Sequence, residues 1–268
     1  MKKLKIYQAD AFTKQLFEGN PAAVIPLETW LPDSVMQHIA AENNLAETAF
    51  IVPTGGKSDY HLRWFTPYIE VRLCGHATLA TAHILFEQLG FDKSEIRFDS
   101  LSGILTVTKQ NDGLLTLNFP TDILRGYDLG SKEATIIYNI LSIKPLAVFR
   151  GRDDFMAVLP SESDVASLKP NFAGLKNLDA RGLIATAKGD TVDFVSRCFF
   201  PEAGVEEDPV TGSAHTTMIP YWAKKLDKNR LFARQISLRG GNLVCVLRDE
   251  RVDISGYAVT YLIGDIFY

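Results

Sequence analysis

Two long helical segments without a polar face constrain this chain's fold more than any other feature of its sequence. One is expected from about residue 76 to 89 and the other from 212 to about 226, and both are apolar on nearly every side. A helix that is apolar all round must be enclosed by the rest of its domain. Each segment also follows a strand that ends in Phe-x-Pro, at residues 65–67 and 199–201. This repeat predicts two similar halves, each with a sheet around its own helix.

Short strands are expected to make up most of the remaining sequence. In the first half they fall near residues 3–9, 22–26, 48–52, 59–65, 96–100, 104–109 and 114–119, with a helix announced at 31–34 and running through 43. In the second half they fall near 146–149, 155–159, 183–187, 192–200, 235–238, 242–247, 252–255 and 258–263, with helices over 132–141 and 161–168. This order differs from the strand–helix alternation of a doubly wound parallel sheet.

The predicted fold class is therefore α+β, with two pseudo-symmetric domains over residues 1–125 and 126–268. Each domain is expected to be a curved, mostly antiparallel, barrel-like sheet around a central apolar helix. The last strand of the chain can join the sheet of the first half.

Composition excludes several classes of function. The net charge of −4 is spread over the 268 residues without a basic stripe, which argues against a nucleic-acid partner. No run of 18 apolar residues suits a membrane span, and the first ten residues lack the apolar run of a signal peptide. Three cysteines without a CxxC pair favour a reducing, cytoplasmic setting, and the histidine spacing gives no support to a metal site.

The starts of the two enclosed helices are candidate ligand sites. The first amides of a helix lack intrahelical partners and lie at the positive end of its dipole, so they favour anions. Gly75 in one half, with Gly212 and Ser213 in the other, would let a carboxylate approach the backbone. The alternative is ordinary helix capping by Thr211 or Ser213. If the halves face each other, both helix starts point into one cleft.

Three polar residues near these helix starts could carry chemistry. Glu47 precedes an apolar strand, where partial loss of solvation suits a general acid–base. His76 could orient or protonate a substrate, and Asp208 lies in an acidic loop before the second helix. The alternatives are a solvated strand edge for Glu47, a water-exposed helix start for His76 and an ordinary loop acid for Asp208.

Four segments, taken in order, resemble a known family. They are Gly-Asn-Pro-Ala-Ala-Val at 19–24, Asn-Leu-Ala-Glu-Thr-Ala-Phe at 44–50, Cys-Gly-His-Ala-Thr-Leu-Ala at 74–80, and Glu-Asp-Pro-Val-Thr-Gly-Ser-Ala at 207–214. In order and spacing they are similar to the successive signatures of the phenazine-biosynthesis PhzF-like isomerases, over nearly the whole chain. The resemblance implies the diaminopimelate-epimerase-like fold.

The resemblance also implies the site and the reaction. Glu47 would be the proton-transferring acid–base, with His76 and Asp208 beside it. The substrate would be a small, cyclic carboxylate, held by Gly75, Gly212, Ser213 and Asn20. In the best-known branch of the family, a dihydro-hydroxyanthranilate is isomerised without a cofactor, so no cofactor is expected. Assembly into a homodimer is left open.

Two departures from the family pattern keep other interpretations open. The family usually shows Gly-Arg-Pro where this chain has Arg-Gly-Gly-Asn-Leu at 239–243, and Cys74 replaces a small non-nucleophilic residue. Epimerases of the same fold use two cysteines, one at each helix start. The second half has no thiol in its loop, so Cys74 would lack its counterpart. A non-catalytic carboxylate-binding protein is the remaining alternative.

Overall fold

The computed structural model describes residues 1–201 and 205–268, and it divides into two compact units. Unit 1 contains Met1–Asn118 and Ile254–Tyr268, and unit 2 contains Phe119–Asp253. The chain passes from one unit to the other within two strands, β8 (Leu115–Pro120) and β17 (Arg251–Gly256). Unit 2 is thus an insertion into the chain of unit 1.

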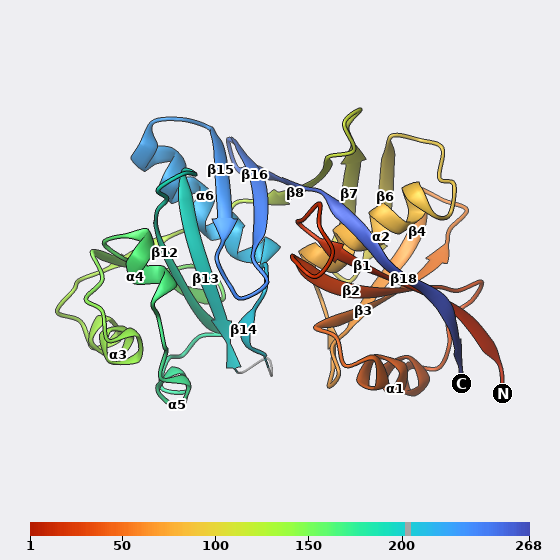
Figure 1. The fold of residues 1–268 in the computed structure, drawn as a ribbon, viewed down its shortest axis with the longest axis horizontal. Coiled ribbons are helices and arrows are strands. Elements are labelled where there is room, and N and C mark those ends of the chain that lie inside the picture. The colour runs from red at the N-terminus through yellow and green to blue at the C-terminus, as the bar shows by residue number, and fades with distance from the viewer. Residues whose placement is uncertain (202–204) are drawn as a thin grey trace. The chain divides into compact units, whose positions relative to one another are not determined.

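Unit 1 surrounds the first of the two predicted helices. This helix is α2 (Gly75–Glu87). The other elements of unit 1 are β1 (Lys3–Ala11), β2 (Asn20–Pro26), α1 (Asp33–Asn43), β3 (Glu47–Pro53), β4 (Tyr60–Phe65), β5 (Glu70–Val71), β6 (Glu95–Ser100), β7 (Gly103–Lys109) and β18 (Ala258–Phe267). In Figure 1 the blue β18 runs beside the red β1, although the two strands stand at opposite ends of the chain.

The strand pairings of unit 1 form one mostly antiparallel series. β1 is antiparallel to both β18 and β2. β3 is parallel to β2 and antiparallel to β4, while β4 is antiparallel to β5 and parallel to β6. β6, β7 and β8 continue as antiparallel neighbours. Because α2 contacts β18, β1, β2, β3 and also β7, the series curves around the helix.

Unit 2 is built on the second helix. Its elements are β9 (Arg125–Tyr127), α3 (Lys132–Leu141), β10 (Ala147–Arg150), β11 (Asp154–Val158), α4 (Glu162–Ala166), α5 (Phe172–Leu175), β12 (Gly182–Lys188), β13 (Phe194–Phe200), β14 (Val205–Asp208), α6 (Gly212–Leu226), β15 (Arg230–Gln235) and β16 (Gly241–Arg248). A buried apolar cluster joins α3, α4 and α5 to the face of β10–β13.

The pairings of unit 2 repeat those of unit 1. β10 is antiparallel to β9 and β11, and β12 is parallel to β11 and antiparallel to β13. β13 is antiparallel to β14 and parallel to β15, which is antiparallel to β16. The strands β10–β16 therefore stand in the same relation to one another as β1–β7. This confirms the pseudo-symmetric α+β fold that the Phe-x-Pro repeat predicts.

The two central helices differ in how fully they are enclosed. Every residue of α2 except His83 and Glu87 is buried, as an all-round apolar helix requires. α6 buries one face and has Lys224 and Lys225 in its last turn, so it is less enclosed than predicted. Pro220 lies inside α6 and has no N–H for the carbonyl of Thr216. That carbonyl instead accepts a hydrogen bond from the backbone N–H of Asp122 at 3.2 Å.

Other features also differ from the sequence-based expectations. The strand predicted at 235–238 is wrong, because β15 ends at Gln235 and a turn follows, with Gly240 at φ +66°. The first unit boundary falls before 125/126, since Thr121 and Asp122 already donate backbone hydrogen bonds to Glu250 and Thr216 of unit 2. α2 starts at Gly75 and stops at Glu87. None of the helices in the described part of the chain has the length and apolar character to cross a membrane.

Candidate active site

Glu47 is the first residue of β3, and the turn before it fixes its position. α1 ends at Asn43, and Asn44 follows in the left-handed conformation at φ 50°, which reverses the chain. Glu47 then pairs with Ala22 of the parallel strand β2. Its side chain is 17% exposed, so the carboxylate is largely removed from water without being sealed off.

His76 lies in the first turn of α2 and faces this carboxylate. His76 Nε2 is 3.1 Å from Glu47 Oε2, and the imidazole is 5% exposed. The two atoms are in ion-pair contact but lack the alignment of a hydrogen bond, and neither has another hydrogen-bond partner among the described residues. The structure therefore brings together in unit 1 the predicted acid–base residue and the predicted histidine.

Asn20 contacts the other ring nitrogen of His76. Its amide nitrogen lies 3.1 Å from His76 Nδ1, and the residue is fully buried. Asn20 follows Gly19, which adopts φ +67° and whose added Cβ would lie 2.2 Å from the carbonyl oxygen of Ala11. Only glycine fits this turn. The structure thus gives Asn20, predicted as a substrate-binding residue, a direct contact to His76.

The protonation of His76 follows from its neighbours. Burial disfavours the imidazolium, but the neighbouring Cys74 and Glu47 side chains favour it more strongly and raise the pKa of His76 well above 6.5. Cys74 is itself a neutral thiol at neutral pH, which leaves the Glu47 carboxylate as the charge that acts there. In the imidazolium both nitrogens carry protons, and in the neutral ring an amide N–H from Asn20 requires Nδ1 to accept. Either way a proton on Nε2 faces Glu47.

Cys74 precedes α2 and does not behave as an activated thiol. Its Sγ lies 3.5 Å from His76 Nδ1, and the side chain is buried. Burial, reinforced by the Glu47 carboxylate, raises the pKa of this thiol to about 11. A nucleophilic cysteine at a helix start needs a lowered pKa instead.

Glu47, Cys74 and His76 also form a set of metal-ligand types that sequence analysis missed. One ligand atom from each lies within 4.8 Å of the others. The three residues come from different motifs, so histidine spacing could not reveal the set. Metal binding would have to displace the thiol proton of Cys74, which the raised pKa opposes. Proton chemistry therefore suits this cluster better than a metal ion does.

In unit 2 the structure brings Asp208 to the start of α6. Asp208 ends β14, and its Oδ2 accepts a hydrogen bond from the Thr211 hydroxyl at 2.6 Å. Thr211 therefore does not cap α6, and neither α6 nor α2 has a side-chain cap at its N-terminus. Gly212 is buried and Ser213 is partly exposed at this uncapped end. The capping alternative is wrong, and the first-turn amides of Gly212 and Ser213 keep the predicted capacity for an anion.

Gln235 organises this helix start and was missed from sequence. Its Nε2 donates to the Asp208 carbonyl at 2.7 Å, and its Oε1 accepts from the Thr211 N–H at 2.8 Å. Cys198 was also missed, a buried thiol on β13 directly opposite Asp208. Burial raises the pKa of Cys198, so it too remains a thiol. The only indication of Gln235 in the sequence was a polar residue at a position that the alternation of its strand places on the buried side.

The candidate residues thus form two groups. Asn20, Glu47, Gly75 and His76 lie together in unit 1, and Asp208, Gly212 and Ser213 lie together in unit 2. A cleft shared by the two groups stays a prediction.

Comparison with known proteins gives this geometry its context. The family model for phenazine biosynthesis-like protein (PhzC-PhzF) matches residues 9–264. An uncharacterized isomerase of Pseudomonas aeruginosa is 48% identical over 264 residues, which cover 98% of this chain and 99% of that protein. A crystal structure of a PhzF family protein from Enterococcus faecalis superposes with a TM-score of 0.94 at 46% identity, covering 100% of both chains.

A more distant structure shows how far the fold extends. A predicted epimerase of Pseudomonas aeruginosa has a TM-score of 0.78 at 19% identity and covers 99% of both chains, so it shares the fold. Fold and close relatives together define an isomerase of the diaminopimelate-epimerase-like class. Within that class, the chain belongs to the phenazine biosynthesis-like protein family.

Proposed function

We propose that this isomerase moves a proton between two carbons of a small, cyclic carboxylate by general acid–base catalysis, without a cofactor. The contact between Glu47 and His76 carries the proposal. A carboxylate that is only 17% exposed, with a protonated imidazole nitrogen 3.1 Å away, can take a proton from a weakly acidic C–H bond and return it.

The proposed reaction conserves every atom. The Glu47 carboxylate removes a proton from one carbon, and the electron pair left behind spreads into the π system conjugated with the substrate carboxylate. Glu47, now a carboxylic acid, returns the proton to a second carbon of the same face. His76 holds its Nε2 proton toward Glu47 and stabilises the carboxylate at both ends of this cycle.

The unit 2 residues supply substrate binding in this proposal. The uncapped first turn of α6 offers the amides of Gly212 and Ser213 to the substrate carboxylate. Asp208, held by Thr211, would accept a hydrogen bond from a polar substituent of the ring. These two assignments are supported by the local geometry of unit 2 and by membership in the family.

The thiol-based epimerase alternative fits the geometry less well. Cys74 and Cys198 are both buried, and burial raises the pKa of each. A thiol that stays protonated at neutral pH is a poor base for a C–H proton. Cys74→Ala is therefore expected to keep most of the activity.

The test is a screen for solvent exchange followed by one substitution. Cyclic amino acids and hydroxy acids are incubated with the protein in D₂O, and incorporation of deuterium at carbon is followed by NMR. Glu47→Gln should reduce exchange by at least about 100-fold, while ligand affinity changes by less than about tenfold, because only the base is removed. The matched control is Glu42→Gln, an exposed carboxylate on α1.

A second readout needs no substrate. Removal of the Glu47 charge should lower the pKa of His76, which a pH titration of the imidazole signals measures directly. A Glu47→Gln protein that keeps most of its exchange rate, or a Cys74→Ala protein that loses all of it, would contradict the proposal.

A further inference from the structure

The repeated topology lets positions in the two units be compared. Ala22 pairs with Glu47 where β3 begins, and Asp154 pairs with Gly182 where β12 begins. Both pairs join the second and third strands of the repeat that β1–β7 and β10–β16 form, and these two strands run parallel. Gly182 therefore occupies in unit 2 the position that Glu47 occupies in unit 1.

The central helices extend this correspondence. α2 begins at Gly75 after β5, and α6 begins at Gly212 after β14. The second residue of each helix is then His76 in unit 1 and Ser213 in unit 2. At the positions of Glu47 and His76, unit 2 therefore has Gly182 and Ser213, and neither residue has a titratable side chain.

A fixed cation stands beside this place in unit 2. Arg181 precedes Gly182, and its Nη2 lies 3.4 Å from Ser213 Oγ. The guanidinium pairs with the buried carboxylate of Asp154, with Nε 3.0 Å from Oδ1, and lies over the ring of Phe200 at 5.0 Å. Its side chain is still 40% exposed, so it is held in place and remains accessible.

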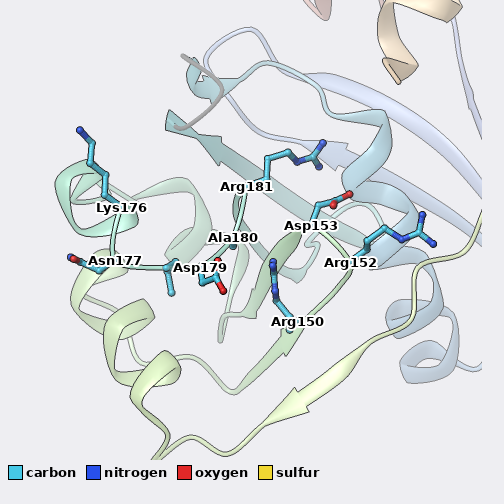
Figure 2. Close-up of a pocket in the computed structure, with 9 residues that line it drawn as sticks. Arg150, Arg152, Asp153, Lys176, Asn177, Asp179, Ala180 and Arg181 are labelled. Carbon is cyan, nitrogen blue, oxygen red and sulfur yellow. The ribbon is translucent and has the colours of Figure 1, made fainter. Parts of the chain in front are cut away.

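Arg181 borders an open pocket of about 630 Å³ in unit 2. The pocket lies between the β10–β11 turn and the segment from Lys176 to Arg181 (Figure 2). The backbone N–H of Arg181 donates to the carbonyl of Asp153 at 2.8 Å, which ties the two segments together. The turn itself is fixed by Asp122, whose carboxylate accepts from the backbone N–H of Arg152 at 3.0 Å.

Arg150 is the strongest sign of a ligand in this pocket. Its side chain points toward Asp179 and Ala180 in Figure 2 and lies over the ring of Phe155 at 5.0 Å. Its Nη1 is buried and has no hydrogen-bond partner in residues 1–201 and 205–268. Burying part of a cation without a partner is costly. Because the charge is delocalised over the guanidinium, an anion on its accessible edge would offset that cost.

The charge of the lining favours an anion over a cation. Arg150, Arg152, Lys176 and Arg181 give four positive charges against two negative charges from Asp153 and Asp179, and the pairing of Arg181 with buried Asp154 leaves one net positive charge. We propose that Arg181 and Arg150 form an oxoanion-binding site in this pocket, for a carboxylate or phosphate group of a small molecule. The site adjoins the first turn of α6, where Arg181 contacts the Ser213 hydroxyl, and its existence does not depend on proton transfer by Glu47.

The test is binding of inorganic phosphate and of malonate, measured by isothermal titration calorimetry at low ionic strength. Arg150→Gln and Arg181→Lys should weaken the Kd of the preferred anion by about tenfold or more, the loss expected for a charged hydrogen bond or a bidentate contact. The matched control is Arg230→Gln, another arginine of unit 2 that lies over a phenylalanine ring, at 5.7 Å. It should change the Kd by less than about twofold. A preference for phosphate or for malonate identifies the group that the site takes.

Two outcomes would overturn the proposal. One is the absence of saturable binding of either anion to the unmodified protein. The other is equal binding by the unmodified protein and Arg150→Gln, which would place the anion elsewhere, for example at α6. Arg181→Lys keeps a positive charge beside buried Asp154, and Arg150→Gln leaves that pair intact, so circular dichroism should show both variants folded.

Discussion

Replacing His215 with asparagine should remove a large part of the protein's sensitivity to acid. His215 is fully buried on α6, and its Nδ1–H donates to the carbonyl of Thr211 at 2.8 Å. Burial, only partly offset by that hydrogen bond, lowers the pKa of His215 from 6.5 to about 4. The folded protein therefore keeps His215 neutral at pH values where the unfolded chain is already protonated.

The size of the effect follows from linkage. Between pH 6.5 and 4 the unfolded chain binds a proton that the folded chain does not, so the stability contributed by His215 is complete above pH 6.5 and is lost as the pH falls. The difference between 6.5 and 4 is roughly 2.5 pK units, which corresponds to about 3 kcal/mol. Asparagine keeps a side-chain N–H close to Nδ1 but does not titrate.

The assay is urea unfolding at several pH values from 7 to 4, followed by circular dichroism and tryptophan fluorescence. His215→Asn loses the ring contact with Phe194 (5.8 Å between centroids), so it should be less stable at pH 7. Its loss of stability on acidification should nevertheless be smaller than that of the unmodified protein by about 3 kcal/mol. The control His38→Asn, at an exposed histidine, should leave the pH profile unchanged. Equal acid losses in His215→Asn and the unmodified protein would refute the reasoning.

Two further predictions concern the turn that leads into β2. Gly19→Ala should destabilise the protein by more than about 2 kcal/mol in urea unfolding, because its Cβ would meet the Ala11 carbonyl at 2.2 Å. Gly90→Ala is the control, since Gly90 has a similar φ of +68° with nothing within 4 Å, and equal losses would show that backbone strain alone is responsible. At pH values high enough for the His76 ring to be neutral, Asn20→Ala should shift the ring proton away from Nε2, as seen in imidazole ¹⁵N chemical shifts, and unchanged shifts would remove Asn20 from the site.

Much of the fold could be predicted because its pattern is repeated. The enclosure of α2 follows from its apolar residues, and the repeated Phe-x-Pro sequence marks equivalent strand ends in the two units. The strand at 230–235 could not be predicted in the same way. There the exposed and buried sides alternate, but Phe232 is exposed and Gln235 is buried. Gln235 is buried because its amide bonds to Asp208 and Thr211, a tertiary reason that local sequence does not contain.

The sequence indicated which residues form the site better than it indicated which of their side chains contact one another. Glu47 and His76 could be named from sequence, and the structure places their side chains in contact. The role of Asn20 as a partner of His76 depends on a turn that only the folded strands define. Arg181 could not be found from sequence, since no segment that resembles the family contains it. Its importance follows from the pairing of Asp154 with Gly182.

The pairing of β1 with β18 also has a consequence for synthesis on the ribosome. β1 is translated before unit 2, and β18 follows only after all of unit 2 has been translated. The pairing is closed by reciprocal backbone hydrogen bonds between Lys2 and Tyr268, at 2.9 and 3.0 Å. Unit 2 is continuous in sequence, so it can fold while it is being synthesised. During that time the edge of β1 that pairs with β18 stays unpaired. An unpaired strand edge is a template for association with other nascent chains, so slow translation of unit 2 should increase aggregation.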